Sequence, residues 1–143
     1  MRWRARYPSS AVMVLVLGAL SVLGACTSTE PAGAVDVEQA VRIATDAANA
    51  SGATPAGAAG GDGRGAGGVV LGSMQQGVPY DAFAACTGGG RIGLDVAGSA
   101  YELDCDEQAH RVGEVRAERG ELEVTLTQEN DVASAWGVAF TQR

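Results

Sequence analysis

Three cysteines and one histidine are the residues of this chain best suited to nucleophilic or metal chemistry. Cys86 and Cys105 do not form a Cys-x-x-C motif and no histidine pair accompanies them, so neither a redox pair nor a zinc site is favoured. If the chain is exported to an oxidising compartment, the two cysteines are expected to join. Closing a loop of roughly 20 residues contributes about 3 kcal/mol on chain-entropy grounds. We predict a structural Cys86–Cys105 disulfide, with no metal and no cofactor.

The single histidine, His110, does not lie in a catalytic motif. A hydrolytic triad requires a serine and a carboxylate beside it. No Gly-x-Ser-x-Gly motif marks any serine after residue 25, namely Ser28, Ser51, Ser73, Ser99 and Ser134. We therefore expect His110 to be a solvated loop residue, and we expect the protein not to be an enzyme. A hydrolase with a diffuse carboxylate site is the least favoured alternative.

Glu102, Asp104 and Asp106 alternate along one predicted strand, with Glu107 beside them. Calcium takes six to eight oxygen ligands, which such carboxylates can supply. The segment lacks the loop of a known calcium motif, and alternating charge is typical of a solvated strand face. These carboxylates are expected to be surface residues, with calcium binding left as the alternative.

A glycine-rich run, Gly88-Gly89-Gly90-Arg91-Ile92-Gly93, formally matches the dinucleotide pattern G-x-G-x-x-G. That motif needs a helix to begin at the glycines, because the helix N-terminus binds the pyrophosphate. Here a strand-like alternation follows instead. We interpret the run as a flexible hairpin loop.

Cys26 stands near the start of the chain in a different setting. Three arginines precede residues 11–23, an uncharged run that ends in Leu23-Gly24-Ala25-Cys26. A permanent membrane span needs about 20 apolar residues, so the run is too short for one and typical of a signal peptide.

This arrangement resembles bacterial lipoproteins, whose lipobox reads Leu, a small residue, Gly or Ala, and then Cys. The resemblance covers roughly the first 26 residues and no more. It implies cleavage between Ala25 and Cys26, a diacylglycerol thioether on Cys26, acylation of the new amine by a chain such as palmitate, and attachment to the extracytoplasmic face of the cell membrane. Two or three acyl chains hold a protein stably where one does not. An ordinary secretory signal and an uncleaved anchor are the alternatives.

The charge beyond residue 25 is strongly negative. Seven arginines and all seventeen acidic residues lie there, and seven minus seventeen is −10. Nucleic acid is excluded as a partner because phosphates require a basic surface, and so is electrostatic adsorption to an anionic membrane. The remaining partners are the membrane itself through the lipid, and an envelope protein or a small-molecule ligand.

Periodicity divides the chain into a signal peptide (1–25), a small polar tether (26–36), an amphipathic helix (37–51), a linker (52–68) and a β domain (69–143). Asp36 is positioned to cap the helix, with Gln39 three residues on. Its alanine-rich stripe is narrow, so it is expected to dock loosely at best. Residues 52–68 contain eight glycines, which predicts a flexible linker.

From residue 69 apolar residues recur with a period of two, and turn residues separate the runs. This pattern predicts a small antiparallel β-sandwich or barrel of six or seven short strands. Five aromatic residues are expected in its core, with an exposed sugar or partner surface as the alternative: Tyr80, Phe83, Tyr101, Trp136 and Phe140. In style alone, the region is similar to small lipoproteins of high-GC Gram-positive bacteria.

Taken together, these features predict a non-enzymatic, membrane-anchored lipoprotein of the cell envelope. Its acidic β domain would bind a partner or ligand. An accessory or structural lipoprotein that modulates a neighbouring envelope enzyme or transporter is the alternative.

Overall fold

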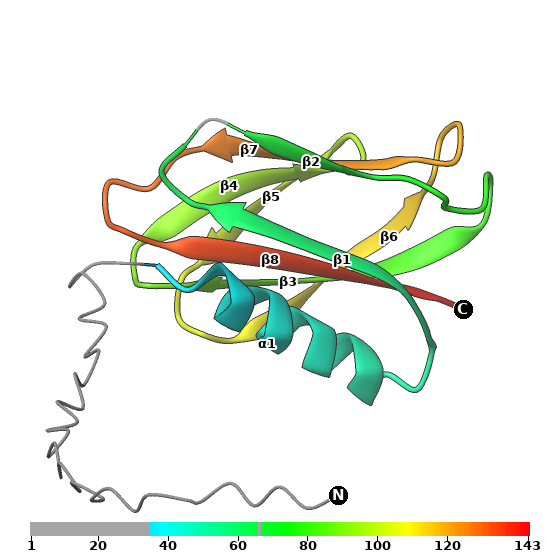
Figure 1. Cartoon of the computed structure of the whole chain (residues 1–143), viewed down its shortest axis with the longest axis horizontal. Helices are drawn as coiled ribbons and strands as arrows, with labels where there is room; N and C mark the ends of the chain where they lie inside the picture. The colour runs from blue at the N-terminus through cyan, green and yellow to red at the C-terminus, as the bar shows by residue number, and fades with distance from the viewer. Residues whose placement is uncertain (1–34, 66) are drawn as a thin grey trace, which may run out of the picture.

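The computed structural model describes residues 35–65 and 67–143. The predicted signal peptide, the predicted cleavage site between Ala25 and Cys26, the predicted lipidation site Cys26 and nearly all of the predicted tether lie outside the described residues. Eight strands form two four-stranded antiparallel sheets that face each other, and one helix packs beside them (Figure 1). The predicted antiparallel sandwich is confirmed, with eight strands rather than six or seven, and the sheets do not close into a barrel.

The elements in chain order are α1 (Val37–Ala50), β1 (Thr54–Asp62), β2 (Gly68–Leu71), β3 (Pro79–Thr87), β4 (Arg91–Val96), β5 (Ser99–Asp104), β6 (Ala109–Arg116), β7 (Leu122–Gln128) and β8 (Ala135–Gln142). Sheet A has the order β1-β8-β3-β6, and sheet B has the order β2-β7-β4-β5. Sheet B, sheet A and α1 form three successive layers (Figure 1).

α1 begins where its cap was predicted. The Asp36 side chain accepts a hydrogen bond from the backbone N–H of Gln39 at 2.9 Å. The expectation of loose docking is wrong, because the helix buries an alanine stripe against β8, β3 and β1. Small residues on both sides allow this close approach: a Cβ on Gly137 of β8 would lie 2.4 Å from the backbone N of Val41.

The predicted flexible linker over residues 52–68 is also wrong. β1 occupies most of it and pairs with β8 from Thr54 opposite Gln142 to Asp62 opposite Ala135. Some of the glycines are required by the space available: a Cβ on Gly60 would lie 2.5 Å from Val41 Cγ2 of α1. The β domain therefore begins at residue 54 instead of 69.

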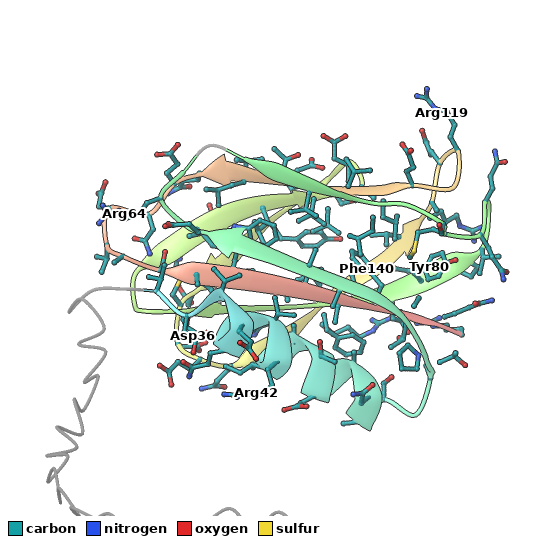
Figure 2. All side chains as sticks on the ribbon, in the orientation of Figure 1. Asp36, Arg42, Arg64, Tyr80, Arg119 and Phe140 are labelled. Carbon is teal, nitrogen blue, oxygen red and sulfur yellow. A yellow bond between two sulfur atoms is a disulfide. The ribbon has the colours of Figure 1, made fainter. Side chains whose placement is uncertain are left out.

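The core lies between the two sheets, as Figure 2 shows for Tyr80 and Phe140. Trp136 joins them there, and the Tyr80 hydroxyl accepts a hydrogen bond from the Gln75 N–H at 2.8 Å. Phe83 belongs to a second apolar cluster, under α1. Tyr101 is partly buried and packs against the edge of the main core. The aromatic residues are thus mainly core, as predicted.

The Cys86–Cys105 disulfide is confirmed, and it joins β3 to the residue after β5. Asn130, in the β7–β8 loop, lies against this bridge and is almost fully buried. Its Nδ2 donates to the Gly89 carbonyl at 2.7 Å, and its backbone N–H donates to the Gly63 carbonyl at 2.8 Å. Three loops at one end of the sandwich are therefore held together by the side chain and backbone of Asn130, next to the disulfide.

Candidate functional site

The outer face of sheet B is left without a covering layer among the described residues. α1 covers the outer face of sheet A, and the inner faces form the core. Along β7, the buried residues Leu122, Val124 and Leu126 alternate with side chains that point outward. This alternation places polar groups from neighbouring strands side by side on an open surface.

A groove of about 670 Å³ runs over this face. The polar residues that line it are Asp95, Arg116, Glu118, Arg119, Glu121, Glu123, Thr125 and Thr127. The turns that join β4 to β5 and β6 to β7 close one end of it. Figure 2 shows Arg119 at the end of the molecule opposite to Asp36 and Arg64.

Register brings the two strands of the groove together. Asp95 of β4 lies opposite Thr125 of β7, and the Ala97 N–H donates to the Glu123 carbonyl at 2.8 Å. Asp95 Oδ1 accepts a hydrogen bond from the Gly98 N–H at 2.8 Å, which holds the turn at the rim. The groove is therefore built on rigid strands and a fixed turn.

The groove carboxylates differ from the other acids of sheet B. Within residues 35–65 and 67–143, Asp95, Glu118, Glu121 and Glu123 take part in no ion pair. Arg116, which shares the groove, is 3.5 Å from Glu114. Arg116 and Arg119 also line the groove, so its four carboxylates leave a net charge of −2. One exposed ion pair is worth only about 0–1 kcal/mol, so a cationic partner must engage several carboxylates at once.

Glu102, Asp104 and Asp106 are exposed, as expected, and they do not converge on one point as the calcium alternative would need. Arg91 Nε donates to Asp104 Oδ1 at 2.8 Å, and Arg91 Nη1 lies 3.7 Å from Glu102. This hydrogen bond lowers the pKa of the Asp104 carboxyl. Asp106 lies 3.6 Å from His110 instead. In the part of the chain that the structure describes, no cluster of three or more His, Cys, Asp or Glu residues could hold a metal.

His110 lies within β6, so its prediction as a loop residue is corrected: pairing with Ala84 of β3 places it on a strand. Its side chain is exposed, as expected. Among the described residues, its one carboxylate within ion-pair distance is Asp106, and no hydrogen bond joins it to a serine. Ser134 is fully buried, and the Ser51 hydroxyl donates to the Ala48 carbonyl at the end of α1. The structure does not bring His110 and a serine into a triad.

The hairpin interpretation of the glycine run 88–93 is wrong, because β3 and β4 belong to different sheets and do not pair. Residues 88–90 form the connection between the two sheets, and residues 91–93 are the start of β4. Gly88, Gly89 and Gly90 all have positive φ, and a Cβ on Gly90 would lie 2.4 Å from Asn130 Oδ1. These glycines therefore serve the loop and its contact with Asn130.

A smaller hollow of about 280 Å³ lies between β5 and β6. Tyr101, Leu103 and Val112 contribute its apolar lining, and charged residues, including His110 and Arg111, contribute the rest. It contains the one aromatic residue at the edge of the core, but it is less than half the volume of the groove on sheet B.

Sequence reasoning missed a charged network on the α1 side of sheet A. Asp81 of β3 is almost fully buried and accepts hydrogen bonds from Arg143, at 2.7 and 2.9 Å, and from Arg111 at 2.5 Å. The hydrogen bond from Arg143 is the main reason that the pKa of the Asp81 carboxyl lies below its ordinary value. This network ties β3, β6 and the end of β8 together. The signal in the sequence that could have revealed this network is Asp81, a charged residue flanked by apolar residues in a strand.

Among the described residues, no helix is both long enough and apolar enough to cross a membrane. Comparison with known protein families, curated proteins and solved structures finds no match to this chain.

Proposed function

We propose that this chain is a non-enzymatic lipoprotein, held at the outer face of the cell membrane through Cys26, that binds a cationic partner in the sheet B groove. The support for the anchor is the lipobox-like sequence Leu23-Gly24-Ala25-Cys26 after a basic segment and a short apolar run. The partner is best described by its chemistry: a lysine- or arginine-rich segment of another envelope protein.

The observation that carries the binding proposal is the set of groove carboxylates without ion pairs. Asp95, Glu118, Glu121 and Glu123 line one groove, and the chain carries a charge of −10 beyond residue 25. The groove volume falls in the range of ligand sites, but such sites for drug-like molecules are mostly apolar. A polar, negative groove favours an extended basic segment, which the field of the whole domain would also attract.

The position of the groove agrees with the proposed anchor. α1 begins at the end of the sandwich opposite to Arg119 (Figure 2). Ten extended residues span at most about 33–36 Å, so a tether over residues 26–36 would let the groove face away from the membrane. This arrangement leaves the groove accessible to a neighbouring protein.

The binding experiment uses an oligolysine peptide as the probe and measures its affinity for the purified chain by fluorescence anisotropy. A variant with Glu118→Gln, Glu121→Gln and Glu123→Gln is compared with a variant that changes Glu107→Gln, Glu129→Gln and Asp131→Asn. Both variants lose three negative charges, but only the first set lines the groove.

We expect the groove variant to bind at least 10-fold more weakly than the matched control, and wild-type affinity to fall as salt rises. Equal weakening in both variants would show that net charge alone attracts the peptide, and the groove would be rejected as the site.

The anchor is tested separately: Cys26→Ala protein should be absent from the membrane fraction prepared from intact cells. If this variant stays membrane-bound at the wild-type level, the lipid anchor is wrong.

A further inference from the structure

The two sheets have four edge strands: β1 and β6 in sheet A, and β2 and β5 in sheet B. An edge strand presents backbone N–H and C=O groups that can pair with another chain. Proteins usually block this with short strands, charged side chains, proline or a bulge. Comparing the four edges therefore shows where a further strand is able to add.

Three of the edges carry such protection. β2 has only four residues. β5 carries the exposed charges Glu102 and Asp104. β6 carries charged residues along its length, including Arg111 and Glu114, and its register with β3 is interrupted by a bulge.

β1 is the exception. It has nine residues and, within the described part of the chain, pairs with β8 alone. Pro55 and a register shift affect only its beginning, and residues 56–61 are alanines and glycines without any charge. Ala58, in the middle of this segment, is exposed. β1 lies along the outer edge of sheet A, next to α1 (Figure 1).

We propose that β1 pairs with β1 of a second copy of this chain. The two strands would run antiparallel around Ala58 and join the two copies of sheet A into one continuous sheet. A two-fold axis at Ala58 places each Asp62 opposite Thr54 of the other copy, so the strand's only charged residue does not face its own copy. Its remaining side chains are small and uncharged.

Charge identifies a second copy as the occupant. A basic partner would be drawn to the carboxylate-lined face of sheet B, whereas an acidic copy is repelled everywhere except along an uncharged stretch. Residues 56–61 provide that stretch. The pairing therefore brings small, uncharged residues together and no like charges along this stretch.

The two-fold symmetry also allows both copies of the chain to attach to the same membrane. The axis of an antiparallel strand pair runs perpendicular to the sheet, so both copies of α1 lie on the same side of the joined sheet. Asp36 caps α1, and both copies of Asp36 are then on that side. Both sheet B grooves face the opposite side. The dimer does not depend on the groove binding any partner.

The test uses disulfide crosslinking of the full chain in intact cells. Cβ atoms of directly opposed residues lie about 4.5–5.5 Å apart, near enough for an engineered disulfide after small adjustment. We expect Ala58→Cys to give a band of twice the monomer mass on a non-reducing gel. The matched control is Ala100→Cys, an exposed alanine on the β5 edge, which should stay monomeric.

Equal crosslinking of both variants would overturn the proposal, since it would report random collision. So would the absence of an Ala58→Cys dimer, or an adduct of another mass in its place.

Charge at the centre of the strand provides a second test, by sedimentation equilibrium of the full chain in detergent. Ala58→Glu places like charges opposite each other and should raise the dimer Kd at least 10-fold. Mixing Ala58→Glu with Ala58→Lys protein should restore dimers, which also shows that both variants fold. The pairing would be refuted if Ala58→Glu protein alone had the dimer Kd of the wild type. It would also be refuted if the mixture of the two variants formed no dimers.

Discussion

Gly137 allows a sharp test of how α1 is held on sheet A. Glycine in a strand is normally unfavourable, and alanine at such a position should stabilise the protein by roughly 0.5–1 kcal/mol. The structure predicts the opposite sign. A Cβ on Gly137 would lie 2.4 Å from Val41 N, 2.5 Å from Val41 Cα and 2.5 Å from the Ala40 carbonyl carbon. All three are backbone atoms, so no side chain can rotate away.

To accept a methyl group there, α1 must move away from the sheet by about 1 Å. A gap of 0.5–1 Å removes a quarter to a half of the dispersion energy of the contacts that it opens. These contacts include the buried stripe of Ala40, Ala44 and Ala48. Overpacking of this kind costs typically 1–3 kcal/mol. We expect Gly137→Ala to lose about 2 kcal/mol of unfolding free energy, which lowers the Tm by roughly 10 °C in a domain of this size.

The assay is urea unfolding followed by circular dichroism, with hydrogen exchange of the α1 amides as a local probe. Gly72→Ala is the matched control, because a Cβ on Gly72 would have no atom within 4 Å and the residue has no positive φ. The control should be neutral or slightly stabilising. If Gly137→Ala is as stable as the wild type and α1 keeps its protection, the close packing of the helix on β8 is wrong.

Three other variants test the remaining contacts. Asp81→Asn should cost roughly 1–2 kcal/mol at pH 7, because the hydrogen bonds from two arginines lose their charge assistance. The pKa of Asp81 is lowered in the folded state, so this stabilisation is present above the unfolded pKa and is lost as pH falls through the folded one. The gap in Tm between the wild type and Asp81→Asn should therefore shrink below about pH 4; a constant gap would contradict the ion-pair explanation. Replacing Cys86 and Cys105 together by alanine should remove roughly 3 kcal/mol of unfolding free energy, and an unchanged denaturation midpoint would count against a stabilising bridge. Asn130→Asp keeps the shape but cannot donate to the Gly89 carbonyl, so urea unfolding should show a loss of about 1–3 kcal/mol; wild-type stability would show that this hydrogen bond is dispensable.

Local pattern was sufficient for the helix, the later strands and the disulfide. Asp36 and the helical spacing after it correctly located α1, because capping and amphipathicity act within a few residues. Alternation along residues 122–128 correctly indicated β7, since a sheet with one buried face imposes a period of two. Cys86 and Cys105 were the pair that remained once Cys26 was assigned to the lipid.

β1 could not be found in this way. Its glycines and alanines carry no alternation, and high glycine content is usual in flexible segments. The small residues of this strand reflect its close packing against α1 and the Trp136 ring. A Cβ on Gly61 would lie 3.1 Å from that ring, which leaves little room for a larger side chain. The same close approach holds α1 tightly on sheet A, with its stripe of Ala40, Ala44 and Ala48 buried.

The groove was hidden for a related reason. Glu121, Glu123 and Thr125 are visible along the sequence as the outward residues of one strand, but Asp95 is about thirty positions earlier. Only the register of β4 with β7 places Asp95 opposite Thr125. Likewise, only the structure shows that Arg91 pairs with Asp104 and Arg143 with Asp81, and that neither arginine pairs with a groove carboxylate.

The sequence by itself determined the elements with a period, the cap, the disulfide pair, the acidic character and the expectation of a lipid on Cys26. Each of these depends on neighbours along the chain or on composition. Only the tertiary structure decided that the glycine-rich segment is a strand, that α1 packs closely on sheet A and that one set of carboxylates shares a groove. Those outcomes depend on steric fit and strand register between residues far apart in sequence, and no local pattern records them.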